Sequence, residues 1–200
     1  MIESIVDDNE RILWRGKPDI VLYIVGNPAI YLVAIFWGLF DLFLISDFLK
    51  DAQFLNGFIF IFFIFHLFPV WFAIIGPIFR LINYRTVEYA ITDKRVYVSR
   101  GIFGRDINTL EHREITNLSV DVNFLENIRK VGTLNLFYNA NVNGAFNYRV
   151  SSDANRFISI EDPYGVYKLL KKVSLDVTTD QAFPNAYRPK ENTGYNTEYK

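Results

Sequence analysis

The sequence predicts an α+β membrane protein, in which a two-helix transmembrane hairpin precedes a seven-stranded β-barrel or sandwich capped by a C-terminal α-helix. The hairpin is indicated by two apolar runs, 20–46 and 54–82, on either side of a polar break at 47–53. A hydrocarbon core of about 30 Å needs about 20 apolar residues in a helix, and each run is long enough. The second half is indicated by short alternating segments between turn residues, which are typical of small all-β domains.

Composition excludes several functional classes. The 200 residues include no cysteine and only two histidines, His66 and His112, and the net charge is −1. Disulfides, thiolate zinc sites and cysteine nucleophiles are therefore excluded, and a nucleic-acid partner is not favoured. We also find no nucleophile-elbow motif, so we expect no catalytic residue, no metal and no cofactor.

The apolar runs divide the chain into four parts. Asn27 and Pro28 suit the start of a first span, 28–46, which rises about 28 Å. A second span, 57–78, rises about 33 Å and is expected to kink at Pro69. We expect a cytoplasmic N-terminal segment (1–19), the hairpin (20–82), a cytoplasmic domain (83–176) and a disordered tail (177–200).

Basic residues indicate the orientation of the hairpin. Several lysines and arginines lie on either side of it, whereas the connecting loop holds only Lys50 against Asp47 and Asp51. Cytoplasmic flanks carry an excess of lysine and arginine. The sequence therefore predicts a two-span protein of the cell membrane with both termini in the cytoplasm. The basic flanking residues are Arg11, Arg15, Lys17, Arg80, Arg85, Lys94 and Arg95.

Two ionisable residues, Asp41 and His66, fall inside the predicted spans. Charge within a membrane is costly, which makes a proton or ion relay one hypothesis. Counted from the loop, Asp41 lies roughly 9 Å deep and His66 roughly 19 Å, so we expect no direct pair. The alternative is that Asp41 extends to the outer interface while His66 hydrogen-bonds another helix or subunit.

The second half of the chain predicts seven strands and one helix. Asp162 and Pro163 suit a helix start, and apolar residues then recur at helical spacing from Val166 to Val173. Seven strands followed by a helix indicate an open barrel closed by that helix. The strand segments are 86–91, 95–100, 105–111, 115–120, 133–138, 145–150 and 156–161.

The chain resembles the bacterial pleckstrin-homology-like membrane proteins of the YdbS/YdbT type. The resemblance rests on the motifs at Glu10–Pro18, at Tyr89–Gly101 with its T-x-x-R turn, and at Ile158–Leu170, in that order around a hairpin. It implies a pleckstrin-homology (PH)-like barrel capped by its last helix, with no catalytic motif to transfer. An asparagine-rich stretch, 139–147, departs from the family, whose members are usually shorter there.

Four basic residues in and after the first β-hairpin are candidates for lipid-headgroup contact, because PH domains that bind phosphoinositides use basic residues there. The alternative is that these charges keep an exposed hairpin soluble, with Arg95 anchoring a turn. His112 lies among polar residues and is interpreted as a surface-loop residue. The four candidates are Lys94, Arg95, Arg100 and Arg105.

The functional hypothesis is a non-enzymatic, membrane-anchored interaction module that binds protein partners or self-assembles at the cytoplasmic face. One alternative is a sensor of anionic lipid headgroups, and a second is an assembly subunit of an oligomeric membrane complex. The expected partners are the bilayer and an unidentified protein, which is either another membrane or cytoplasmic protein or a second copy of the chain.

Overall fold

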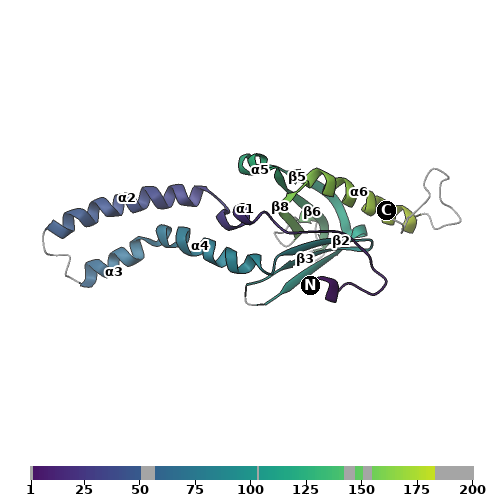
Figure 1. Cartoon of the computed structure of the whole chain (residues 1–200), viewed down its shortest axis with the longest axis horizontal. Coiled ribbons are helices and arrows are strands. Elements are labelled where there is room, and N and C mark those ends of the chain that lie inside the picture. Colours follow the sequence, from purple (N-terminus) through teal and green to yellow (C-terminus); the bar gives the residue numbers. More distant parts are fainter. Residues whose placement is uncertain (1, 51–56, 103, 142–146, 151–154, 183–200) are drawn as a thin grey trace. The chain divides into compact units, whose positions relative to one another are not determined.

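The computed structural model describes residues 2–50, 57–102, 104–141, 147–150 and 155–182 (Figure 1). The chain forms two compact units. One combines Met1–Tyr23 with Asn83–Lys200, and the other is Ile24–Ile82. The apolar region is therefore an insertion between two parts of one domain.

Among the described residues, the first unit contains eight strands in two antiparallel sheets. The first sheet has the order β1-β2-β3-β4; in the second, β6 pairs with β5, β7 and β8. Seven of these strands match the predicted segments, and the eighth, β1, was not predicted. The bounds are β1 Ile12–Gly16, β2 Glu88–Thr92, β3 Arg95–Arg100, β4 Asp106–Glu111, β5 Ile115–Asp121, β6 Val131–Asn141, β7 Asn147–Val150 and β8 Arg156–Glu161.

The main core lies between the sheets and is closed by α6 (Pro163–Ala182). Tyr89 from β2 stacks on Phe157 from β8 with ring centroids 4.9 Å apart, and both are fully buried. Leu134 from β6 and Leu170 from α6 are also fully buried in this cluster. Alternation along the strands places these residues on the inner face, which confirms the period-2 interpretation.

The N-terminal segment is part of the domain. β1 pairs with β2, with Trp14 opposite Ile91. The short helix η1 (Ile2–Ser4) places Ile2 over Ala90 and Tyr97 on the outer face of the first sheet, and all three are buried. Segment 1–19, which was predicted as a part separate from the domain, therefore contributes a strand and a buried apolar residue to it.

Helices at the end and middle of the domain differ in part from prediction. Asp162 caps α6 as predicted, accepting a hydrogen bond from the Gly165 amide at 3.0 Å. α6 continues to Ala182 and so takes in the first six residues of the predicted tail; 183–200 lie outside the described residues.

Two short helices, η3 (His112–Glu114) and α5 (Phe124–Arg129), were not predicted. Part of the asparagine-rich stretch lies at the ends of β6 and β7, and 142–146 lie outside the described residues.

The apolar region contains α1 (Ile20–Val25), α2 (Ala29–Lys50), α3 (Gly57–His66) and α4 (Phe68–Tyr84) (Figure 1). Asn27 accepts a hydrogen bond from the Ala29 amide at 3.0 Å and so caps α2, as predicted. α2 continues four residues past the predicted end at Ser46. Of the described helices, α2 alone is long and apolar enough to cross a membrane; the second predicted span is divided at Leu67.

Candidate functional site

The four basic residues of the lipid hypothesis do not form one cluster. Lys94 and Arg95 lie at the start of β3, whereas Arg100 ends β3 and Arg105 follows the next turn. Five residue steps along a strand separate Arg95 from Arg100 by about 17 Å. A single headgroup cannot contact both pairs.

Two of the four basic side chains, those of Arg95 and Arg100, have internal partners. Arg95 Nη1 lies 2.9 Å from Asp7 Oδ2 and 3.5 Å from Glu10 Oε2. Arg100 Nη2 donates a hydrogen bond to the Arg156 carbonyl at 2.7 Å. Arg95 thus anchors the N-terminal segment, and Lys94 and Arg105 are the more exposed members of the set.

A buried carboxylate, Glu10, explains why Arg95 is needed. The Glu10 side chain is fully buried and accepts hydrogen bonds from the hydroxyls of Tyr97, at 2.9 Å, and Thr92. Thr92 Oγ1 also accepts the Arg95 amide at 2.9 Å, which forms the turn of the T-x-x-R motif. A buried carboxylate is stable only when it is paired and hydrogen-bonded. The sequence showed the motif but not its carboxylate partner, 82 residues earlier.

The interpretation of His112 as a surface residue was wrong, since its exposure is 1%. Nε2 donates to the Thr92 carbonyl at 2.9 Å, because a carbonyl only accepts, and Nδ1 accepts from the Ser174 hydroxyl at 3.3 Å. Burial lowers the pKa of His112 from 6.5, against the opposing effects of the Thr92 carbonyl and the charges of Asp93 and Glu10. α6 covers this imidazole, which neighbouring residues in the sequence cannot reveal.

Asp41 and His66 form a direct pair, contrary to the prediction. His66 Nδ1 lies 2.8 Å from Asp41 Oδ1, and the Asp41 side chain is fully buried. The depth estimate failed because α2 continues to Lys50. Asp41 is then nine residues from the end of its helix, and His66 is nine residues from Gly57 at the start of α3, so the two lie at the same height. Asp41 Oδ2 has no hydrogen-bond partner among the described residues.

The break between α3 and α4 is stabilised by two tryptophans. Pro69 has no amide hydrogen, and the helical hydrogen bonds around it are interrupted. Trp71 Nε1 donates to the Ile64 carbonyl and Trp37 Nε1 to the His66 carbonyl, both at 2.9 Å. In hydrocarbon, where water is absent, carbonyls freed by such a break need a protein donor. The kink predicted at Pro69 is therefore a break between two helices, and the tryptophan side chains donate hydrogen bonds to the backbone carbonyls beside it.

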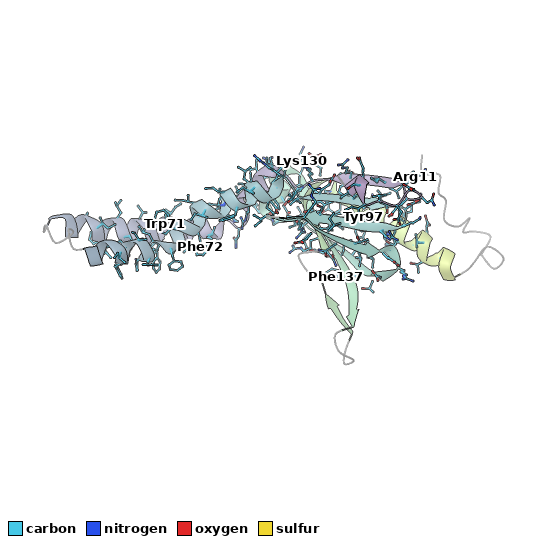
Figure 2. The ribbon with its side chains drawn as sticks, turned by 90° about the horizontal axis from the view of Figure 1, so that it is seen from below. Arg11, Trp71, Phe72, Tyr97, Lys130 and Phe137 are labelled. Atoms are coloured by element: carbon cyan, nitrogen blue, oxygen red, sulfur yellow. The ribbon has the colours of Figure 1, made fainter. Side chains whose placement is uncertain are left out.

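Most large apolar side chains of α2–α4 face outward. Phe36 and Phe65 are each 74% exposed, and Figure 2 shows Phe72 beside Trp71 on α4. Only 11% of the residues in the candidate span of α2 are buried. A soluble protein rarely exposes an apolar patch larger than a few hundred Å².

A shallow groove lies between β5 and α6 of the domain. Its volume is about 350 Å³, and its lining includes Leu118 from β5 and Tyr167, Lys171 and Leu175 from α6. In the described part of the chain, β5 has β6 as its one sheet neighbour. The groove thus borders an edge strand of the second sheet, where the Leu118 amide donates a hydrogen bond to the Asn117 side chain at 2.9 Å.

The residues of this site do not form a metal centre. Among the described residues, no group of three or more histidine, aspartate and glutamate side chains is placed to hold a metal ion. The described features of the chain are a closed β-core, a groove beside β5 and an apolar helical region.

A family comparison identifies this combination. The sequence of residues 20–173 matches the family described as bacterial PH domain. The chain belongs to the bacterial PH domain family. The match takes in the apolar region and the strands β2 to β8, and it confirms the resemblance to bacterial PH-like proteins.

Two further comparisons add little to the PH domain assignment. A solved protein of the DUF1696 family with a pleckstrin-homology domain, from Shewanella loihica PV-4, is similar at 15% identity and a TM-score of 0.29. The similarity covers 44% of this chain and 70% of that one. The search of curated proteins gives no significant match.

Proposed function

We propose that this bacterial PH domain protein is a two-pass membrane protein and a non-enzymatic module for protein interaction at the cytoplasmic face. The observation that carries the topology is the pairing of β1 with β2. These strands flank the apolar region, so both of its ends must lie on the same side of any membrane. If α2 crosses the bilayer, α3 and α4 must return.

The return segment is long enough. Residues 57–84 in helix span about 42 Å, which exceeds a hydrocarbon core of about 30 Å. The two indole donors at the break, Trp37 and Trp71, supply the hydrogen bonds that lipid does not. The excess of basic residues before α2 and after α4, compared with the loop, supports a cytoplasmic domain.

A protein partner is favoured over a lipid headgroup as the ligand of this domain. Lys94 and Arg95 are separated from Arg100 and Arg105 along β3, and Arg95 and Arg100 have internal partners. The groove instead lies beside β5, an edge strand of the second sheet among the described residues, and an edge strand suits an extended polypeptide segment. Since the hairpin already fixes the domain at the membrane, lipid binding adds no recruitment.

Cross-linking in membranes tests this proposal. The chain has no cysteine, so Leu175→Cys in the groove can carry a photo-cross-linker without background labelling. Tyr164→Cys is a matched control, because Tyr164 is 60% exposed against 61% for Leu175 and does not line the groove. We expect adducts of defined mass from Leu175 only.

The mass of the adduct separates the outcomes. An adduct of twice the chain mass indicates self-assembly, and any other defined mass indicates a different protein. No adduct, together with salt-sensitive binding to anionic liposomes that Lys94→Gln and Arg105→Gln abolish, would contradict the proposal and favour the lipid sensor.

A further inference from the structure

The helix α5 exposes two large apolar side chains on one face. Phe124 is 78% exposed and Ile128 is 62% exposed, and residues four apart lie on the same side of a helix. They are the two most exposed large apolar side chains of the described domain. Packing within the domain therefore does not explain why large apolar residues occur at these two positions.

The remainder of α5 is held firmly, which fixes this exposure. Asn123 and Glu126 form a reciprocal capping box, with hydrogen bonds of 2.9 and 3.0 Å. Glu126 is buried and accepts hydrogen bonds from the hydroxyls of Thr133 and Ser159 at 2.7 and 2.8 Å. Glu126 is two residues from both Phe124 and Ile128, so its inward position turns them outward.

A salt bridge joins α5 to the start of α1. Arg129 donates two hydrogen bonds to the Asp19 carboxylate, at 2.9 and 2.7 Å. Partial burial raises the pKa of Asp19, but hydrogen bonds from Arg129 and the Leu22 amide outweigh it and lower that pKa overall. Ile20 and Val21, which follow Asp19, are 44% and 45% exposed. We call Ile20, Val21, Phe124 and Ile128 the α5 edge.

The sequence around the α5 edge points to a bilayer as its occupant. Val21 precedes the candidate span at Ala29 by eight residues, so its side chain cannot lie far from the point where the chain enters a membrane. Lys17 and Lys130 are exposed next to the edge in sequence, and Lys130 is labelled in Figure 2. Large apolar side chains with flanking lysines suit the boundary between headgroups and acyl chains.

We propose that the α5 edge inserts into the headgroup–acyl boundary of the cytoplasmic leaflet and so sets the orientation of the PH domain on the bilayer. This inference rests on the proposed two-pass anchoring. It assigns the lipid contact to apolar side chains of α5 and α1 and not to the first β-hairpin.

Site-specific fluorescent labels test the inference in the full chain. Ile128→Cys and Phe124→Cys report on the α5 edge, and Leu175→Cys is a matched control at 61% exposure on another helix. Each variant is labelled with an environment-sensitive dye and reconstituted into phosphatidylcholine–phosphatidylglycerol vesicles with nitroxide lipids. Phe36→Cys, on α2, reports on insertion of the hairpin itself.

The labels give distinguishable results. We expect emission at shorter wavelength and strong nitroxide quenching at positions 128 and 124, several-fold above that at 175. Quenching at 36 without excess quenching at 128 or 124 would overturn the α5 inference alone. A blue shift at 128 without nitroxide quenching would also overturn it, since a protein and not lipid then covers the edge. No quenching at 36 would overturn both proposals.

Discussion

In the PH domain, Phe157, Leu134 and Leu170 are completely buried, whereas in the hairpin Phe36 and Phe65 are each 74% exposed. Apart from hydrogen-bonded carboxylates such as Glu10 and Glu126, which are buried in the domain, charged side chains show the reverse preference. Asp41 is completely buried between the hairpin helices, although charges such as Lys94 cover the outside of the domain. With the hairpin in a bilayer, as proposed, this difference has one explanation: each unit hides from its surroundings the groups that those surroundings cannot solvate.

Matched phenylalanine substitutions test this comparison with the largest expected effect. Phe157→Ala should lower the free energy of unfolding of the domain by about 3–5 kcal/mol, because it leaves a cavity in the core. Phe36→Ala should change the free energy of unfolding of the domain by less than about 0.5 kcal/mol, since the Phe36 side chain lies outside the domain core. Denaturant unfolding of the full chain in lipid nanodiscs gives both values, and equal losses would break the comparison.

The buried pair of the hairpin is the next test. His66→Phe leaves the Asp41 carboxylate buried without its imidazole partner and should destabilise the hairpin by about 3 kcal/mol. The double variant Asp41→Leu/His66→Phe removes both groups and should recover most of that loss. Thermal unfolding in nanodiscs measures the cycle, and additive effects of the two substitutions would show that the pair is not coupled.

The indole donor at the helix break should have a smaller effect. Trp71→Phe removes the hydrogen bond to the Ile64 carbonyl and should cost about 1 kcal/mol in a bilayer. Phe72→Leu is the matched control, because this neighbour is 63% exposed and changes only in apolar shape. Equal stability of the two variants would show that the carbonyl does not need its donor.

His112 predicts a modest pH dependence in the PH domain. Its pKa is lowered in the folded chain from 6.5, so below about pH 6.5 the unfolded chain binds a proton that the folded chain does not. Stability should therefore fall as the pH falls from about 7.5 to 5.5, and it should fall less in His112→Gln. Thermal unfolding of both proteins across this range isolates His112, because His66 is common to both. A steeper dependence in the variant would contradict this assignment.

The sequence predicted the elements whose residues follow a local pattern. Alternation indicated β2 to β6 and β8, and the Asp162–Pro163 start indicated α6. β1 was not predicted, because it has only five residues and pairs with a strand that begins 76 positions later, so no local pattern marks it. Asn123 and Glu126 form a capping-box pattern that is visible in the sequence and indicates a helix start, although no helix was predicted at α5.

The site residues show the same limit. The predicted difference in depth between Asp41 and His66 was counted from a helix end at Ser46. Because α2 continues four residues further, that difference disappears and the two side chains pair. His112 and Glu10 are buried by segments distant in sequence, so no local pattern marks them. The pairing of β1 with β2 places both ends of the apolar region in one domain, whereas the choice of the cytoplasmic side rests on the basic residues in the sequence alone.

The measurement that tests the central claim most directly is the accessibility of single cysteines in sealed membranes. Gln53→Cys lies in the loop sequence, Asp8→Cys reports on the N-terminal segment and Leu175→Cys on α6. With a membrane-impermeant maleimide on right-side-out vesicles, we expect labelling at 53, and at 8 and 175 only after permeabilisation. Labelling of all three, or of none, before permeabilisation would contradict a two-pass hairpin that holds the PH domain in the cytoplasm.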